Sequence, residues 1–163
     1  MKIHIIGGSG TGKSYIADIL SKQFKVPHFD LDDIFWDNNS QYYGIKMPIN
    51  RRTKLLEKIL QEENWIIEGV YYKWLEDSFK KADYIFILNV STWVYKYRII
   101  LRFLKRKVGI AKGKKETIES LIKLIKWTDN YNKKTIPKII DFLEPYKKKV
   151  IVLESAIDIL KYT

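Results

Sequence analysis

The segment from Gly7 to Ser14 reads GGSGTGKS and matches the pattern G-x-x-x-x-G-K-[ST] in full. It directly follows a short apolar run, Lys2–Ile6, and it opens an amphipathic segment, Lys13–Phe24. Glycines let backbone N–H groups turn inward around phosphate oxygens, and a helix that begins where the loop ends adds its partial positive charge. The sequence therefore predicts a strand, a phosphate-binding loop and a helix, in that order.

The loop predicts binding of a nucleoside triphosphate, expected to be ATP, together with Mg²⁺. Lys13 is expected to reach the β- and γ-phosphates, and the Ser14 hydroxyl to ligate magnesium. A glycine-rich turn without a ligand is the alternative, and the full match between a strand and a helix disfavours it. The nucleotide-binding residues that the motif predicts are Gly8, Ser9, Gly10, Thr11, Gly12, Lys13 and Ser14.

Short apolar runs alternate with amphipathic segments along the rest of the chain. Strands are predicted over Lys2–Ile6, Pro27–Leu31, Trp65–Glu68, Tyr84–Asn89 and Lys149–Leu153. Helices are predicted over Lys13–Phe24, Asn50–Glu63, Tyr71–Phe79, Thr92–Lys107, Glu116–Tyr131, Pro137–Phe142 and Ala156–Tyr162, and irregular loops over 37–49 and 105–115. Because the strands are almost continuously apolar, they predict a parallel sheet that is buried on both faces. The chain is thus expected to form one α/β domain over residues 1–163, with three layers and helices on both faces of the sheet.

The charge of the chain is concentrated in its second half. Residues 1–90 carry 12 basic and 12 acidic side chains, whereas residues 91–163 carry 18 basic and 7 acidic ones and account for the net charge of +11. Such a basic half predicts an anionic partner: phosphates, nucleic acid or an anionic membrane surface. The alternative is the composition of a lysine-rich proteome, since 25 of the 30 basic residues are lysines. The absence of cysteine excludes disulfides, a thiol nucleophile and a cysteine zinc site. No apolar run is long enough for a signal peptide core or a membrane span, which favours a cytoplasmic protein.

Carboxylates follow two of the predicted strands. Asp30, Asp32 and Asp33 come at the end of the second strand, and Glu68 ends the third. Because ligands of open α/β sheets bind at the carboxyl ends of the strands, Asp32 is expected to orient or deprotonate an acceptor hydroxyl. Glu68 is expected to help Ser14 organise magnesium. The alternatives are structural, since Asp32 or Asp33 could cap a short helix and Glu68 could be an acid at a helix N-terminus.

Three of the five arginines form one stripe. Arg98, Arg102 and Arg106 are spaced i, i+4 and i+8 in a predicted helix and therefore share a face. Guanidinium groups bind the equatorial oxygens of a phosphoryl group in the transition state of transfer, so Arg98 and Arg102 are predicted to act in catalysis. The alternative is that the stripe is a solvated basic face. The remaining arginines, Arg51 and Arg52, open another helix and are candidates for binding an acceptor phosphate. His4 and His28 are expected to be structural.

Four segments resemble a known family: the loop GGSGTGKS, LDDIFW at 31–36, WIIEGVYYKWL at 65–75 and YRIILRFLKRK at 97–107. The chain resembles the small P-loop kinases related to adenylate kinase, and more closely the bacterial DNA topology modulation proteins. The family pattern has Asp-Gly-Asn-Tyr where this chain has Glu68-Gly69-Val70-Tyr71, and an arginine where Lys73 stands. The resemblance implies a five-stranded parallel sheet in the order 2-3-1-4-5, an arginine-bearing lid within about 91–131, and an adenine-contacting loop near Glu154–Ile157.

Three functions are compatible with these features. The first is a magnesium-dependent kinase that transfers the γ-phosphate of ATP to a small acceptor, a nucleotide among the candidates, with Lys13, Asp32, Arg98 and Arg102 as its catalytic residues. The second is a nucleotide-gated nucleic-acid-binding protein that uses the basic half. The third is a regulatory ATP sensor without transfer chemistry. We expect the first, because the acidic strand ends and the arginine stripe both suit phosphoryl transfer.

Overall fold

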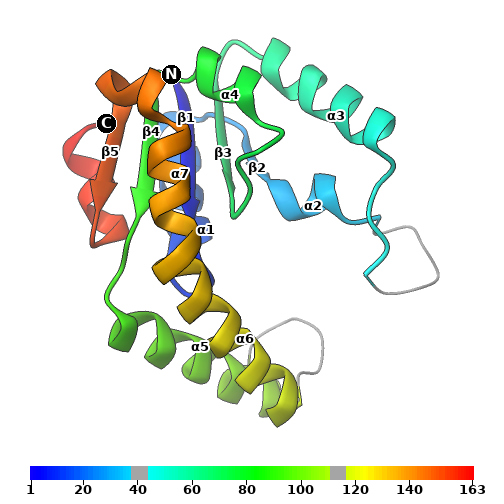
Figure 1. Ribbon diagram of the computed structural model, residues 1–163, viewed down its shortest axis with the longest axis vertical. Coiled ribbons are helices and arrows are strands. Elements are labelled where there is room, and N and C mark those ends of the chain that lie inside the picture. The colour runs from blue at the N-terminus through cyan, green and yellow to red at the C-terminus, as the bar shows by residue number, and fades with distance from the viewer. Residues whose placement is uncertain (38–43, 111–116) are drawn as a thin grey trace.

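The computed structural model describes residues 1–37, 44–110 and 117–163. Its strands are β1 (Lys2–Gly7), β2 (His28–Asp30), β3 (Trp65–Gly69), β4 (Tyr84–Leu88) and β5 (Val150–Leu153). They form one parallel sheet in the order β2-β3-β1-β4-β5 (Figure 1). Both the predicted α/β class and the predicted strand order 2-3-1-4-5 are confirmed.

Helices cover both faces of this sheet and make the predicted three layers. The α-helices are α1 (Lys13–Phe24), α2 (Leu31–Phe35), α3 (Ile49–Gln61), α4 (Glu76–Lys81), α5 (Thr92–Lys107), α6 (Ile118–Asn130) and α7 (Ile136–Phe142). A π-helical turn, η1 (Tyr131–Thr135), joins α6 to α7, and two 3₁₀ helices, η2 (Glu144–Lys149) and η3 (Ala156–Lys161), flank β5. In Figure 1, α7 crosses in front of the sheet, while α5 and α6 lie beyond the carboxyl ends of the strands.

Two apolar clusters hold the layers together. One joins a face of the sheet to α3, α4 and α7 through buried side chains such as Ile67, Leu60 and Ile139. The other joins the opposite face to α1 and η3 through residues such as Ile5, Leu20 and Ile159. Because side chains of β1, β3 and β4 point alternately into the two clusters, these strands are apolar at nearly every position. The sheet is therefore a rigid base for the loops at its carboxyl edge.

The predicted helix at Tyr71–Phe79 is wrong in its first half. The helix α4 begins only at Glu76, and the preceding residues form an irregular turn in which the Leu75 N–H donates to the Tyr72 carbonyl. The Tyr71 ring stacks on Phe35 at a centroid distance of 4.3 Å. Aromatic side chains at this turn are held by contacts with residues far away in the sequence, and those contacts override the local helical pattern.

The second strand ends earlier than predicted. β2 stops at Asp30, and the next five residues form α2. The Asp30 carboxylate accepts a hydrogen bond of 2.9 Å from the Asp32 backbone N–H and so caps this helix. The predicted cap at Asp32 or Asp33 is wrong, because the capping carboxylate belongs to the residue that precedes the helix.

The chain is helical without a break from Ile118 to Phe142, although two separate helices were predicted there. Pro137 lacks a backbone N–H, and in a regular α-helix its ring would clash with the carbonyl group four residues earlier. The π-turn widens the helix just before it, and the Ile136 N–H donates to the Tyr131 carbonyl, five residues back. The predicted interruption is thus a local widening of one long helix.

Residues 38–43 of the first predicted loop, residues 111–115 of the second and Glu116, where the next helix was predicted to begin, lie outside the described residues. In the described part of the first loop, Lys46 forms an antiparallel bridge with Trp36, which directly precedes the loop. The predicted helix Thr92–Lys107 is confirmed by α5, so the predicted loop, which overlapped it from residue 105, begins only after Lys107. Across the described ranges, no helix combines the length and the apolar character that crossing a membrane requires.

Candidate active site

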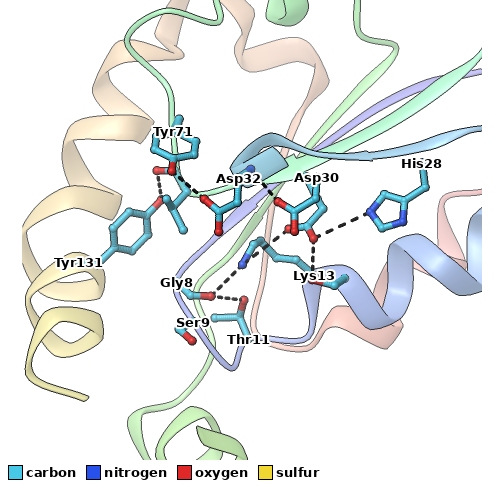
Figure 2. A network of polar contacts seen from close by, with 12 residues as sticks. Gly8, Ser9, Thr11, Lys13, His28, Asp30, Asp32, Tyr71 and Tyr131 are labelled. Atoms are coloured by element: carbon cyan, nitrogen blue, oxygen red, sulfur yellow. Dashed lines mark hydrogen bonds and ion pairs between the residues drawn. The ribbon is translucent and has the colours of Figure 1, made fainter. Parts of the chain in front are cut away.

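The candidate site lies at the carboxyl ends of β1, β2 and β3 (Figure 2). The strand register places Asp30 beside Glu68, and Glu68 beside Ile5, which lies two residues before the glycine-rich loop. Parallel pairing therefore brings residues from three distant parts of the sequence to one edge of the sheet. This register brings the carboxylates that follow β2 and end β3 close to the loop.

The loop between β1 and α1 has the backbone that a phosphate cradle requires. Gly10 and Gly12 have φ angles of 74° and 98°, which side chains of L-residues rarely allow. A Cβ atom on Gly10 would lie 2.8 Å from the Tyr95 carbonyl oxygen, because α5 packs directly on the loop. The Thr11 hydroxyl donates to the Gly8 carbonyl over 2.9 Å and closes the turn. The glycines thus serve both the loop conformation and the close approach of α5.

Lys13 lies folded into the loop. Its Nζ donates a 3.0 Å hydrogen bond to the Gly8 carbonyl and lies 3.9 Å from Glu68 Oε2. Burial lowers the pKa of Lys13, while the charge of Glu68 acts in the opposite direction. A buried ammonium with one short contact is suited to exchange that contact for an anion.

Ser14 and Glu68 are directly bonded. The Ser14 hydroxyl donates a 2.5 Å hydrogen bond to Glu68 Oε1, and His28 Nε2 lies at an ion-pair distance of 3.9 Å from the same oxygen. Burial alone would raise the pKa of Glu68, but His28, Lys13 and Ser14 together hold it below its usual value. The side chain therefore remains a carboxylate, paired with the hydroxyl that the sequence predicted as a magnesium ligand. No group of three or more His, Cys, Asp or Glu side chains arranged to hold a metal occurs in the described part of the chain.

Asp32 faces the loop from the other side (Figure 2), and one of its oxygens accepts a 2.7 Å hydrogen bond from the Tyr71 hydroxyl. Burial and the bond to Asp32 raise the pKa of Tyr71, so its hydroxyl stays a donor at neutral pH. Burial, followed by the charge of Glu68, raises the pKa of Asp30 to about 6. Asp30 is thus a capping residue in a negative environment, whereas Asp32 presents a positioned carboxylate.

The two predicted arginines of α5 touch different parts of the loop. Arg98 donates to the Thr11 carbonyl over 3.1 Å, and Arg102 donates to the Ser9 hydroxyl over 3.3 Å. Arg98 also lies near Gly12, on the side where Ala156 of η3 approaches. Arg106, one turn further along, is half-buried on the same helix. The stripe is therefore no plain solvated face, because two of its three members bond to the loop.

Arg52 and Arg51 point to different environments, although they are adjacent. The Arg52 guanidinium lies over the rings of Trp74 and Phe35, 4.4 and 5.3 Å from their centroids, whereas Arg51 is exposed. Phe35 in turn stacks on Tyr71, the partner of Asp32. Arg52 thus belongs to an aromatic wall, made of Phe35, Trp36, Tyr71 and Trp74, that borders the Asp32 carboxylate.

The contacts of α6 and η1 with the phosphate loop were not predicted from the sequence. A Cβ atom on Gly8 would lie 3.0 Å from Asn132 Oδ1, 3.1 Å from Thr128 Cγ2 and 3.3 Å from the Tyr131 ring. The Tyr131 hydroxyl donates to the Val70 carbonyl, next to Tyr71. The only local signal for this arrangement is Pro137 inside a helical pattern, which indicates a distorted helix but not its contacts.

His4 is a core residue, as expected, whereas His28 lies at the candidate site and its structural role stays a prediction. His4 is fully buried in β1, where Nδ1 lies 2.7 Å from the Ser78 hydroxyl, and burial lowers its pKa to about 3. His28 lies beside Glu68 and supports its charge.

The structure is similar to solved small-molecule kinases. A gluconokinase from Sinorhizobium meliloti 1021 superposes with a TM-score of 0.56 at 14% identity, over 98% of this chain and 87% of that one. A shikimate kinase from Aquifex aeolicus vf5 gives 0.54 at 16% identity over 99% and 93%, and one from Bacteroides thetaiotaomicron gives 0.51 at 19% over 96% and 86%. At these identities the likeness shows the fold, which is that of the P-loop kinases.

Sequence comparisons find a relative over part of the chain and no family. An uncharacterized protein of Bacillus subtilis (strain 168), YqaC, is 38% identical over 93 residues, which cover 56% of this chain and 48% of that protein. The chain thus spans about half the length of this curated relative. A scan against models of protein families finds no match. Membership of the DNA topology modulation proteins stays a prediction, and the likeness to the solved structures shows a P-loop kinase fold.

Proposed function

We propose that this chain is a magnesium-dependent phosphotransferase that moves the terminal phosphate of ATP onto a hydroxyl group of a small acceptor. One observation carries the proposal: the Ser14–Glu68 pair and Lys13 lie at the base of the loop, and the Asp32 carboxylate faces that loop from α2, directly after β2. A mere nucleotide sensor has no need of a carboxylate held opposite the phosphates.

The loop residues fit a triphosphate and Mg²⁺. The positive φ angles at Gly10 and Gly12 and the hydroxyl of Ser14 are the features that a P-loop uses to bind phosphates and magnesium. Ser14 would hold the metal, with Glu68 orienting it through the hydroxyl or a water. When bound, magnesium supplies charge neutralisation on the phosphate oxygens, with its other ligands taken from phosphate and water.

The remaining residues divide the work of transfer. The oxygen of the acceptor hydroxyl bonds to the γ-phosphorus while Asp32 accepts the proton of that hydroxyl. The bond between the γ-phosphorus and the β–γ bridging oxygen breaks, and ADP leaves. Lys13 and Arg102 offset the charge that develops on the transferred group and on the leaving oxygen. Arg98, which lies near Gly12 as Ala156 does, binds the nucleotide further from the reacting phosphorus.

The acceptor side favours an anionic molecule. Arg52 lies on the aromatic wall beside Asp32, where it can bind a carboxylate or phosphate of the acceptor while the rings of Phe35 and Trp74 contact the acceptor's body. In this proposal residues 1–163 work as one unit, in which α5 and α6 of the predicted region 91–131 cover the phosphate loop as a lid.

The experiment that tests the proposal is a transfer screen with γ-labelled ATP and Mg²⁺. Sugar acids, hydroxy acids, nucleoside monophosphates and neutral sugars serve as acceptors, and Lys13→Ala serves as the inactive control. A labelled product from anionic acceptors, absent with the variant, supports the proposal. If ATP binds tightly and no acceptor of any class is labelled, the transfer function is refuted.

Nucleic-acid binding remains the second candidate from the sequence. Its support is the charge of residues 91–163, yet Arg98 and Arg102 in that region bond to the phosphate loop. Including duplex DNA in the same screen separates the two functions, because phosphate release that occurs only with DNA favours the nucleic-acid function.

A further inference from the structure

The π-helical turn η1 brings one polar side chain against the phosphate loop. Asn132 is the second residue of this turn, and its Oδ1 would lie 3.0 Å from a Cβ atom placed on Gly8. Regular α-helical geometry from α6 onward would rotate the side chains beyond this turn to other directions, since a π-turn inserts one extra residue into the helix. Asn132 lies at the start of this widening and meets Gly8 together with Thr128 and Tyr131.

The Asn132 amide is buried without being satisfied. Both Oδ1 and Nδ2 are inaccessible to solvent, and neither has a hydrogen-bond partner among the residues that the structure describes. An amide of this kind has one oxygen acceptor and two N–H donors, and buried polar groups are almost always paired. An asparagine that only filled space would be replaced without loss by leucine, which has a similar volume and no polar atoms.

The surroundings of Asn132 identify what its partner would be. At the same end of the loop, Lys13 Nζ bonds to the Gly8 carbonyl and Arg102 bonds to the Ser9 hydroxyl. Two cations and the amide therefore converge on the Gly8–Ser9 turn, and an anion placed there would meet donors from α1, α5 and η1. Terminal phosphate oxygens accept such hydrogen bonds and carry the charge that the two cations complement.

We propose that the Asn132 side-chain amide donates a hydrogen bond to the terminal phosphate of bound ATP and so distinguishes ATP from ADP. This inference rests on the proposed function only in requiring a nucleotide in the loop. The Tyr131 hydroxyl fixes the turn to the Val70 carbonyl over 2.8 Å, and the adjoining Tyr71 holds Asp32. Asn132 therefore lies on a turn that is tied to both the phosphate loop and the acceptor carboxylate.

The experiment compares nucleotide affinities by calorimetry, with Mg²⁺ and either ADP or a non-hydrolysable ATP analogue. The proteins are the wild type, Asn132→Leu and the control Lys134→Ala, which alters an exposed residue of the same turn. We expect Asn132→Leu to weaken binding of the ATP analogue about tenfold and to leave ADP within twofold, since a hydrogen bond to a charged group is lost. The control should leave both affinities unchanged.

A thermal melt of the nucleotide-free proteins supplies the second readout. If the amide serves only a ligand, Asn132→Leu should melt at the same temperature as the wild type or higher, because two unsatisfied buried atoms are gone. Should Asn132→Leu fail to fold, Asn132→Asp is used, and its charge should repel the ATP analogue more than ADP. An unchanged ratio of the two affinities in the variants overturns the inference but not the kinase function. If the wild type binds neither nucleotide, both are refuted.

Discussion

The Ser14 hydroxyl donates a 2.5 Å hydrogen bond to Glu68 Oε1 and thereby joins the last residue of the phosphate loop to the end of the neighbouring strand β3. The two residues are 54 positions apart, and the parallel pairing of β1 with β3 brings them together. The bond holds the hydroxyl in one orientation, toward the carboxylate and beside Lys13. A magnesium ligand that is oriented in advance needs less reorganisation when the metal binds.

Glu68→Gln should therefore make ATP affinity largely independent of Mg²⁺. Glutamine keeps the shape and an acceptor for Ser14 but removes the charge, and loss of such a supporting group lowers metal affinity or activity by roughly 10- to 100-fold. We expect Mg²⁺ to strengthen ATP binding to the wild type and to have little effect on the variant, as measured by calorimetry with and without Mg²⁺. Glu63→Gln, at an exposed carboxylate just before β3, is the matched control. Equal magnesium dependence in all three proteins would contradict the role of Glu68.

Alanine substitutions of Arg98 and Arg102 should affect ATP affinity and turnover to different extents. Arg102→Ala is expected to lower phosphoryl transfer by roughly 100-fold or more, because its guanidinium lies at the end of the loop where charge develops, and to change ATP affinity only severalfold. Arg98→Ala is expected to do the reverse, because it bonds to the Thr11 carbonyl near Ala156. Steady-state kinetics and calorimetry on both variants check this, with Lys105→Ala, at an exposed position of the same helix, as the control. Identical profiles for the two arginine variants would rule out the division of roles.

The close approach of α5 to the loop can be measured with two glycine variants. Gly10 and Gly109 have similar φ angles, 74° and 77°, but a Cβ atom on Gly10 would lie 2.8 Å from the Tyr95 carbonyl oxygen, whereas none of the described atoms lies within 4 Å of one on Gly109. Gly109→Ala should lower the free energy of unfolding by about 1 kcal/mol through backbone strain. Gly10→Ala should lower it by roughly 2 kcal/mol more, because α5 must move. Urea unfolding of both variants gives the difference, and similar losses would mean that α5 does not press on the loop.

The sequence predicted well those parts of the fold whose causes are local. The P-loop is recognised because its glycines, Lys13 and Ser14 must keep a fixed spacing, and the strands because burial on both faces makes them continuously apolar. The separation of Arg98 and Arg102 by four residues likewise places both on one face of α5, where they contact the loop.

The features that the sequence did not predict depend on contacts between distant residues. Tyr71 was placed in a helix, and only its contacts with Phe35 and Asp32, more than 30 residues earlier, keep it in a turn. The five residues of α2 are too few to show a helical period. Asn132 reaches Gly8 across 124 positions of the sequence, and nothing in the residues around it indicates that neighbour.

The raised pKa of Asp30 predicts how the free energy of unfolding depends on pH. Its pKa is raised to about 6 in the fold and is near 3.8 in the unfolded chain, so between about pH 4 and pH 6 the folded state holds a proton that the unfolded state has released. The contribution of Asp30 to the free energy of unfolding therefore falls as the pH rises from about 4 to about 6. Asp30→Asn removes this effect and still caps α2. The variant should match the wild type near pH 4 and be more stable above pH 6.

Urea unfolding of both proteins between pH 4 and pH 8 measures this difference. His4 contributes the opposite slope, because its pKa is lowered to about 3 and its stabilisation is lost as the pH falls from 6.5, but it is common to both proteins and cancels. Glu57→Gln, at an exposed carboxylate of α3, should show no such trend. A difference between Asp30→Asn and the wild type that is constant with pH would show that Asp30 does not titrate in this window.

Tyr71→Phe tests whether Asp32 must be held in place. Phenylalanine keeps the ring that stacks on Phe35 at 4.3 Å and removes only the hydroxyl that donates to Asp32. We expect the free energy of unfolding to fall by about 1 kcal/mol and the kcat for the acceptor found in the transfer screen to fall roughly tenfold, with an unchanged KM for ATP. Tyr72→Phe, where the ring packs edge-on against Phe142, is the control. Because a general loss of structure would raise the KM for ATP as well, an effect confined to kcat identifies Tyr71 as the residue that positions Asp32, and an unchanged kcat would refute that role.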